Sequence, residues 1–438
     1  MYNLVVSKFG GSITCSAEKV KRAVEIIKSN PALHYVIASA PGTNPPNHGI
    51  TDMLFMCHSR FSNKGNYQEM LAKISDSYRA IINDLGINFD LEAEIETLRK
   101  DLIAGREHGY IGSRGEYIMG KILAELLGWT FVDAAELIFF NDDGTLNEAK
   151  TFNTANAKLK NIEYAVIPGF YGSMPDGKIK TFPRGDGDSS GAIVARAVNA
   201  DLFEKWSEVN KVFAADTNVI PESILVKNMT YNEIIELNYI RKTIIRDSVI
   251  FMLKEAGIPM KVSGIYDNEG TLISSKFPEG TRRNAAVCIS GRRNFKILNV
   301  EKYGLNEIFG FGEKLLGIFA KYGVACEHCL SGIHKIALVI KNPMFDLKYS
   351  SIVDEIKRII EPDSVTVDKD LSLITVISEG MSTVSGKFEK IFFALWKPKI
   401  NVKMLEQGAD DVNIILGVSD KDYENALRAL YETVICEA

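Results

Sequence analysis

Residues 4–12 of the chain read Leu-Val-Val-Ser-Lys-Phe-Gly-Gly-Ser, an apolar run that ends in a lysine, two glycines and a serine. Val20, Val24 and Ile27 follow at helical spacing, so the pattern predicts a strand, a tight turn and a helix. Glycines let backbone N–H groups approach an anion, the helix presents its N-terminus, and Lys8 adds a positive charge. The stretch therefore predicts a triphosphate site. A plain turn is the alternative interpretation, because Gly-Gly pairs are common in turns.

The alternation of apolar runs and amphipathic stretches continues through the first 276 residues. This pattern is typical of an α/β fold, here a mostly parallel sheet sandwiched by helices, and we assign it to a domain at 1–276. Residues 65–127 are predicted to be mainly helical and to help close a substrate cleft. The predicted strands are 4–6, 35–38, 129–132, 164–167, 202–206 and 258–262.

The pattern changes after residues 277–284, whose proline, glycine and charges indicate a linker. Two α+β units follow, and we assign them to domains at 285–362 and 363–438. The first has predicted strands at 295–300, 324–329 and 335–340, and helices at 313–322 and 349–360. The second has predicted strands at 371–377, 400–405 and 411–417, and helices at 386–395 and 421–434.

A second glycine-rich segment, Thr181–Gly191, reads Thr-Phe-Pro-Arg-Gly-Asp-Gly-Asp-Ser-Ser-Gly and leads into a predicted helix at 192–200. Asp188 and Ser189 can cap that helix, and its N–H groups would make a second anion site facing the first. Arg184 offers a planar fork suited to a carboxylate. A flexible capped loop without a ligand is the alternative.

Composition excludes several classes of function. The formal net charge of the 438 residues is −5, so no global positive field attracts nucleic acid or an anionic membrane. The six cysteines are scattered, as in a reducing compartment, and the C-x-x-C at Cys326 and Cys329 lacks the second ligand pair of a zinc site. No signal-peptide pattern and no run of roughly 18 apolar residues is present. We therefore expect a cytoplasmic protein with no nucleic-acid or membrane partner.

The order of these motifs resembles the amino-acid kinase superfamily and, within it, the aspartate kinases. Val6–Ser12 is similar to the opening motif of that family, and the tandem C-terminal units look like its ACT domains of βαββαβ type. Further similar motifs are Ser39-Ala40-Pro41-Gly42, Thr51-Asp52-Met53-Leu54, Gly115-Glu116-Tyr117-Ile118-Met119, Pro168–Gly172, and Trp206–Val209 through Ala215-Asp216. The resemblance covers essentially the whole chain.

The resemblance implies an amino-acid kinase-like fold and the phosphorylation of L-aspartate by ATP to L-aspartyl 4-phosphate, the first step toward lysine, threonine and methionine. It implies catalytic roles for Lys8 and Asp188, with Mg²⁺ held mainly by the phosphates and Asp188 as the candidate protein contact. Substrate-binding roles are implied for Ser39, Thr51, Glu116 (aspartate ammonium) and Arg184 (α-carboxylate). Nucleotide-binding roles are implied for Gly10, Gly11, Ser12, Ser207, Glu208, Phe213 and Asp216. The β-carboxylate of aspartate is ionised at neutral pH, so no general base is needed.

The loop at Arg184 departs from the family pattern, with Pro183, Asp186 and Gly187 at positions where the family has Gly, Gly and Ser. The usual downstream lysine aligns with Thr243. Two alternatives follow: a sibling kinase acting on N-acetylglutamate or glutamate, and a catalytically weakened regulator that senses an amino acid. The resemblance also implies an amino-acid effector at the ACT domains, and exposed sheet edges there predict a homodimer or tetramer.

Overall fold

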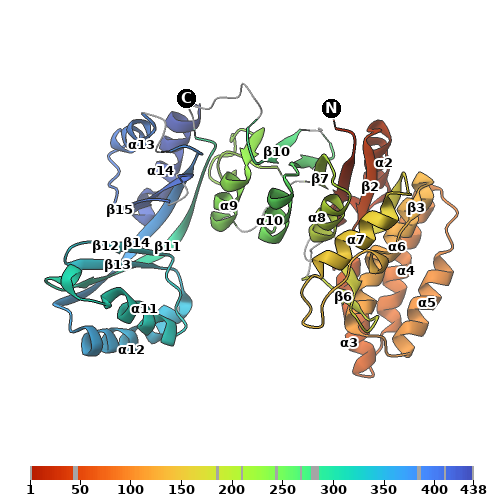
Figure 1. Ribbon diagram of the computed structural model, residues 1–438, viewed down its shortest axis with the longest axis horizontal. Coiled ribbons are helices and arrows are strands. Elements are labelled where there is room, and N and C mark those ends of the chain that lie inside the picture. The colour runs from red at the N-terminus through yellow and green to blue at the C-terminus, as the bar shows by residue number, and fades with distance from the viewer. Residues whose placement is uncertain are drawn as a thin grey trace. The chain divides into compact units, whose positions relative to one another are not determined.

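The computed structural model of the chain describes residues 2–42, 48–183, 187–208, 211–241, 245–266, 269–277, 286–381, 386–408 and 411–436. The chain folds into two compact units, whose elements are labelled in Figure 1. The N-terminal unit comprises Met1–Val212, Leu225–Asn238 and Thr243–Pro278, and the C-terminal unit comprises Phe213–Ile224, Tyr239–Lys242 and Glu279–Ala438. Among the described helices, none is long and apolar enough to cross a membrane.

Two short segments that we assigned to the domain at 1–276 associate instead with the C-terminal unit, namely Phe213–Ile224 and Tyr239–Lys242. Arg241 shows the reason. Its guanidinium donates to the carbonyl of Phe213 at 2.8 Å and to the carbonyl of Ile289 at 3.0 Å. The boundaries near residues 276, 285 and 362 otherwise remain proposals, and the predicted linker at 277–284 lies almost wholly outside the described residues.

The N-terminal unit is built on an eight-stranded sheet with the order β3-β4-β2-β1-β7-β9-β10-β8. Every neighbouring pair is parallel except β9 and β10, so the predicted mostly parallel sheet is confirmed. Its strands are β1 (Val5–Phe9), β2 (Leu33–Ala38), β3 (Thr130–Phe131), β4 (Ala165–Pro168), β7 (Leu202–Ser207), β8 (Asn228–Thr230), β9 (Met260–Gly264) and β10 (Gly270–Ser274). A separate hairpin joins β5 (Tyr171–Ser173) and β6 (Ile179–Thr181).

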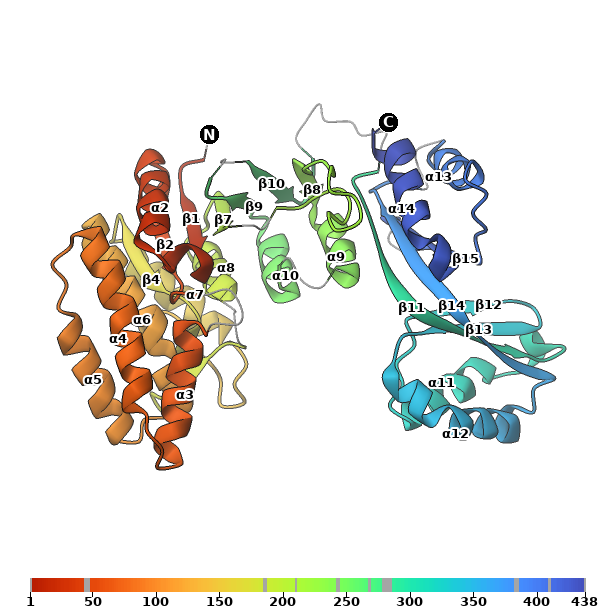
Figure 2. The ribbon, with the colours of Figure 1, turned by 180° about the vertical axis from the view of Figure 1, so that it is seen from behind.

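Helices cover both faces of this sheet, as Figures 1 and 2 show from opposite sides. One layer consists of α7 (Glu148–Leu159), α8 (Gly187–Ala197) and α10 (Asp247–Ala256). The other consists of α2 (Ala17–Ser29), α3 (Ile50–Ser62), α4 (Gln68–Leu85), α5 (Leu91–Ile103) and α6 (His108–Leu127), so the predicted helical stretch at 65–127 is confirmed. Also described are α1 (Gly11–Thr14), α9 (Tyr231–Ile240) and a 3₁₀ helix at Ala134–Glu136.

The C-terminal unit is built on a six-stranded antiparallel sheet with the order β12-β13-β11-β14-β16-β15. Two 14-residue strands, β11 and β14, lie at its centre. The elements are β11 (Cys288–Glu301), α11 (Phe311–Lys321), β12 (His328–Ser331), β13 (Lys335–Ile340), α12 (Pro343–Ile360), β14 (Ser364–Ile377), α13 (Lys387–Trp396), β15 (Met404–Gln407), β16 (Asn413–Val418) and α14 (Tyr423–Leu430).

The long central strands belong to two modules at once. In the first module, the second half of β11 pairs with β13 and with the first half of β14. In the second module, the second half of β14 pairs with β16 and with Cys288–Arg292 at the start of β11. Each module is therefore a βαββαβ unit, and the second takes its last strand from chain that precedes the first. The end-to-end arrangement expected from the sequence differs from this interleaved one, because the predicted strands covered only half of β11 and half of β14.

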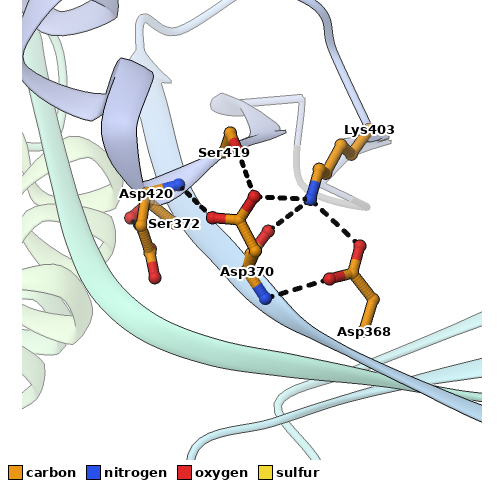
Figure 3. Close-up of polar contacts among 6 residues, drawn as sticks. All are labelled: Asp368, Asp370, Ser372, Lys403, Ser419 and Asp420. Atoms are coloured by element: carbon orange, nitrogen blue, oxygen red, sulfur yellow. Dashed lines mark hydrogen bonds and ion pairs between the residues drawn. The ribbon is translucent and has the colours of Figure 1, made fainter.

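A polar network holds β14 near the point where it passes from one module to the other (Figure 3). Asp370 accepts a hydrogen bond from the backbone N–H of Asp420 at 2.8 Å and another from the hydroxyl of Ser419. Lys403 makes ion pairs with Asp370 at 3.1 Å and with Asp368 at 3.0 Å. The hydrogen bond from Ser419, that from Asp420 and the contact with Lys403 together lower the pKa of Asp370 to about 2.

We expect Asp370→Ala to lower the free energy of unfolding by about 1–2 kcal/mol at pH 7, because several modest hydrogen bonds are lost together. A carboxylate with a lowered pKa stabilises the fold above its ordinary value of 3.8 and loses this effect as pH falls toward 2. Thermal melting of the wild type and the variant between pH 7 and pH 2.5 should therefore show a shrinking difference. Asp354→Ala, on the exposed side of α12, is the matched control. A constant difference across this range would contradict the prediction.

Candidate active site

The candidate site lies where the parallel strands of the N-terminal unit end. Because β1, β2, β4 and β7 run in the same direction, their carboxyl ends meet at one edge of the sheet. Parallel α/β sheets bind their ligands at this edge. The residues that follow these strands are Gly10-Gly11, Ser39-Ala40, Gly169-Phe170 and Glu208. The edge therefore gathers the glycine turn after β1 with the serine and acidic positions that the sequence had singled out.

The turn after β1 is tightly packed against the turn after β2. The N–H of Gly10 donates to the carbonyl of Trp206 at 3.1 Å, and the carbonyl of Gly11 accepts from the N–H of Gly42 at 2.9 Å. A Cβ atom on Gly11 would lie 2.8 Å from the carbonyl oxygen of Ala40, closer than real side chains approach. Glycine is thus required at position 11 for steric reasons, independently of any ligand.

Beside this turn, the carboxylate of Asp188 lies between two lysines. Its Oδ1 is 2.8 Å from Nζ of Lys8, and its Oδ2 is 2.7 Å from Nζ of Lys205. Lys8 and Lys205 are register partners on the neighbouring strands β1 and β7, so both side chains leave the same face of the sheet toward α8. All three residues are buried, with exposed fractions of 6–7%. The three groups together carry one net positive charge in a place largely shielded from water.

The environment keeps Asp188 ionised. Burial alone would raise the pKa of this carboxyl, but the charges of Lys8 and Lys205 outweigh burial and hold the pKa well below its usual range. Removing either lysine would leave the buried carboxylate of Asp188 with one positively charged partner instead of two, which is costly in a low-dielectric site.

Glu116 of α6 has a raised pKa, in contrast to the lowered pKa of Asp188. It is buried at the same edge, where its Oε1 accepts a hydrogen bond from the hydroxyl of Thr51 at 3.4 Å. Within the described residues its Oε2 has no hydrogen-bond partner. Burial raises the pKa of Glu116 to about 7, although hydrogen bonds and the charge of Lys8 limit the rise. A buried carboxyl with a spare oxygen is suited to receive a cationic group.

Ser39 completes this part of the edge. A Cβ atom on Gly187, the first residue of α8, would lie 3.2 Å from both Oγ of Ser39 and Cε of Lys8. The absence of a side chain at position 187 therefore lets α8 approach β1 and β2 closely. The sequence had suggested that Asp188 and Ser189 cap a helix beginning at residue 192. α8 begins instead at Gly187, so both residues lie in its first turn.

The end of β7 is tied to the helix that follows the glycine turn. The carboxylate of Glu208 makes an ion pair with Lys19 of α2 at 2.7 Å, and its N–H donates to the hydroxyl of Ser12 at 3.4 Å. The hydrogen bond to Glu208 is the main cause of the raised pKa of Lys19. Ser207 is buried next to Glu208. This part of the predicted nucleotide site is thus assembled in the N-terminal unit.

Three predicted site residues are not brought into this cluster by the described structure. Arg184 lies outside the described residues, as does Thr243, the position that aligns with the family's downstream lysine. Phe213 and Asp216 belong to the C-terminal unit, where Oδ1 of Asp216 accepts from the N–H of Asn218 at 2.9 Å within a turn. Their nucleotide-binding roles remain predictions.

Lys205 is the residue that sequence reasoning missed. Its signal was present, because Glu204 and Lys205 are adjacent charges in a central strand that is otherwise apolar or neutral, Leu202–Ser207. Buried charges are rarely found without partners. Glu204 faces the other side of the sheet and accepts hydrogen bonds from Ser7 at 2.7 Å and Trp206 at 3.1 Å.

The cysteine pair at Cys326 and Cys329 gains no support as a metal or redox centre. Burial raises the pKa of Cys326 to about 11, which disfavours the reactive thiolate. The described residues also contain no group of three or more His, Cys, Asp or Glu side chains placed to hold a metal ion.

Comparison with known proteins identifies the family. The model of the amino acid kinase family matches residues 3–266, and the model of an ACT domain matches residues 374–434. Aspartokinase 3 of Bacillus subtilis is 27% identical over 448 residues, covering 98% of each chain. The crystal structure of the aspartate kinase of Clostridium acetobutylicum is 35% identical, with a TM-score of 0.91, covering 99% of this chain and all of that one.

The chain belongs to the aspartate kinases.

More distant aspartate kinases share the fold. E. coli aspartokinase III has been solved with aspartate and ADP, and again with lysine and aspartate. At 21% identity, these two structures have TM-scores of 0.68 and 0.73, covering 98% and 99% of this aspartate kinase and 99% and 100% of the E. coli chains. Membership confirms the predicted kinase with a carboxyl group as acceptor, and neither the N-acetylglutamate nor the glutamate kinase alternative is favoured.

Proposed function

We propose that the buried cluster of Lys8, Asp188 and Lys205 receives the terminal phosphate of ATP, which is transferred to the side-chain carboxylate of L-aspartate. The product is the acyl phosphate L-aspartyl 4-phosphate. The observation that carries this proposal is the position of two lysines beside a glycine turn at the ligand-binding edge of an aspartate kinase fold. The aspartate and ADP in E. coli aspartokinase III support the choice of substrates.

At the phosphate end, Lys8 neutralises charge that accumulates on the migrating group, while the N–H groups around Gly10, Gly11 and Ser12 hold the phosphate oxygens. Asp188 fixes the position of the Lys8 ammonium. Both oxygens of Asp188 face lysines, so a magnesium ion that binds with ATP would take its ligands mainly from phosphate oxygens and water, as is usual for Mg²⁺ with ATP. Asp188 is the residue that would reach such an ion, which would neutralise charge on the triphosphate.

At the acceptor end, the spare oxygen of Glu116 receives the ammonium group of aspartate, and Ser39 and Thr51 help to position the substrate. Arg184 is proposed to bind the α-carboxylate. The attacking carboxylate needs no general base, because its ordinary pKa of about 3.9 keeps it ionised at neutral pH. Catalysis then consists of positioning two anions and neutralising their charge.

At the nucleotide end, Ser207 and Glu208 are proposed to line the site from the N-terminal unit, and Phe213 and Asp216 to contact the nucleotide from the chain that follows. We also propose a cytoplasmic location and a place at the first step toward lysine, threonine and methionine. The ACT modules are proposed to bind an amino-acid effector, in line with the lysine bound by E. coli aspartokinase III. Gly310, with a φ of +68° at the start of α11, forms the turn where such an effector would bind.

Turnover is tested by ATP-dependent hydroxamate formation with aspartate, glutamate and N-acetylglutamate in the presence of Mg²⁺. We expect product from aspartate alone. Lys8→Met should lower kcat by about 10²–10³-fold, because a preorganised charge at the transferring group is lost. Lys28→Met, on the exposed side of α2, is the control. Amino-acid binding without turnover by the wild type would favour the regulator that the altered loop at Arg184 had suggested.

The raised pKa of Glu116 predicts how aspartate binding depends on pH. The ionised carboxylate binds an ammonium group and the protonated form does not, so KM for aspartate should rise by up to about tenfold per unit as pH falls below 7. Glu116→Gln should raise KM at every pH and remove this dependence, measured between pH 6 and pH 8.5. Glu125→Gln, an exposed residue of the same helix, should retain the wild-type profile. A wild-type KM that is flat with pH would contradict the assigned role.

We propose that two chains associate through the first ACT module. β12 is an end strand of its sheet, and strongly exposed apolar side chains lie close to it. Tyr303, Phe309 and Ile333 are on neighbouring segments, since the N–H of Asn306 donates to the carbonyl of Ile333 at 3.2 Å. Phe309 is 97% exposed, an arrangement that is costly for an apolar side chain unless a partner covers it.

Light scattering coupled to gel filtration tests this association. The wild type is expected to have the mass of a dimer or tetramer. The double variant Phe309→Glu/Ile333→Glu should shift it toward the monomer, because four charges would be buried across a two-fold interface. Ile103→Glu, an exposed apolar position in the N-terminal unit, should leave the mass unchanged. An unaltered oligomer in the double variant would exclude this surface.

A further inference from the structure

Lys205 is a buried cation to which the sequence motifs assign no role, and the proposed function includes it in the phosphate-receiving cluster without giving it a role of its own. It lies two residues before the end of β7, and Lys8 lies one residue before the end of β1. The two positions are register partners, so the ammonium groups lie at equivalent heights along neighbouring strands. Each binds a different oxygen of the same carboxylate, at 2.8 Å for Lys8 and 2.7 Å for Lys205.

We propose that Lys205 is a positioning residue for phosphoryl transfer. By binding one oxygen of the Asp188 carboxylate, it leaves only the other oxygen for Lys8, so that the positive charge of Lys8 stays directed at the terminal phosphate. This inference rests on the proposed function of the same site. Its physical basis is the sharing of one anion by two cations. A carboxylate that meets a single lysine can turn both oxygens toward it and neutralise it, whereas a shared carboxylate offers each lysine one oxygen.

The surroundings leave the carboxylate little freedom to rearrange. Asp188 is in the first turn of α8, whose first residue, Gly187, packs closely on Lys8 and Ser39. Lys205 binds the second oxygen from β7, a central strand that is paired with β1 on one side and with β9 on the other. Burial strengthens these ion pairs, because water cannot screen them as it does at a surface. Losing Lys205 would free Asp188 to rotate fully onto Lys8.

The effect of Lys205 should therefore depend on the terminal phosphate. If Lys205 only stabilised the fold, its loss would weaken the binding of all ligands to the same extent. A residue that keeps the charge of Lys8 available should matter for ATP, which places its γ-phosphate there, and much less for ADP, which lacks this group. Aspartate, which is bound by groups on α6 and the neighbouring loops in the proposed scheme, should be affected least.

The test compares Lys205→Met with the wild type. We expect kcat to fall by about 10–100-fold, comparable with the loss of one preorganised charge contact. The dissociation constant of the non-hydrolysable analogue AMP-PNP, measured by calorimetry with Mg²⁺, should rise by about tenfold. The dissociation constant of ADP and KM for aspartate should stay within about threefold. Lys205→Arg, which retains the charge, should recover part of kcat.

Lys261→Met is the matched control. Lys261 is on the adjacent strand β9, opposite Glu204 in register, and so faces the side of the sheet away from Asp188. This variant should match the wild type in kcat and in both dissociation constants. Lys205→Gln, which keeps a polar side chain of similar length, serves as a second neutral variant if Lys205→Met is unstable, and circular dichroism melting checks the fold of each.

Several outcomes would overturn the inference. The first is a folded Lys205→Met variant with kcat near that of the wild type. The second is an equal weakening of AMP-PNP binding and ADP binding in this variant. The third is failure of both neutral variants to fold, which would make the ion pair purely structural. Failure of the proposed function is a separate result, seen as wild-type protein that forms no hydroxamate from aspartate. The comparison of AMP-PNP with ADP would still test Lys205 in that case.

Discussion

The ion pairs of Asp188 with Lys8 and Lys205 constrain much of the N-terminal unit. Three charged groups can be buried together only if β1 and β7 are neighbours in register and α8 begins directly above them. That close approach is favoured by glycine at position 187, where a Cβ atom would crowd Lys8 and Ser39, and the glycine turn after β1 packs on the loop after β2. The buried charges and the closely packed glycines therefore lie at the same edge of the sheet, which is also the edge where parallel sheets bind anions.

The sequence predicted the parts of this site whose signals are local. Lys8 with its glycine pair, Glu116 on a helix and Asp188 in a glycine-rich segment all belong to short motifs, and the structure brings Lys8, Glu116 and Asp188 to the same edge. Lys205 was missed because its partner lies 17 residues earlier on another element, and a lysine within a strand carries no motif of its own. The start of α8 was placed too late because three glycines mark Gly185–Gly191 as a loop, although tertiary contacts hold Gly187–Gly191 in a helix.

The sheet of the N-terminal unit was predictable for a similar reason, since buried parallel strands are continuous apolar runs separated by amphipathic helices. The C-terminal sheet was predicted less completely. The first half of β11 contains Gly291, Arg292 and Arg293 and has no apolar alternation, and its apolar residues Cys288-Ile289 alone are too few to predict a strand. Its pairing partner, the second half of β14, lies far along the chain. Register shifts between Arg292 and Ile297 mark the change from one module to the other, and no local pattern encodes them.

The interleaving of β11 and β14 has a consequence for biosynthesis. Cys288–Arg292 leaves the ribosome before the whole first ACT module, yet its neighbour in the sheet, Leu373–Ile377, emerges only after that module is finished. The backbone groups of the early half-strand that pair with β14 have no partner until the intervening helices and strands have been synthesised. The second module therefore cannot be deleted, exchanged or appended by cutting the gene at one point, because any single cut between the modules separates it from its strand at Cys288–Arg292.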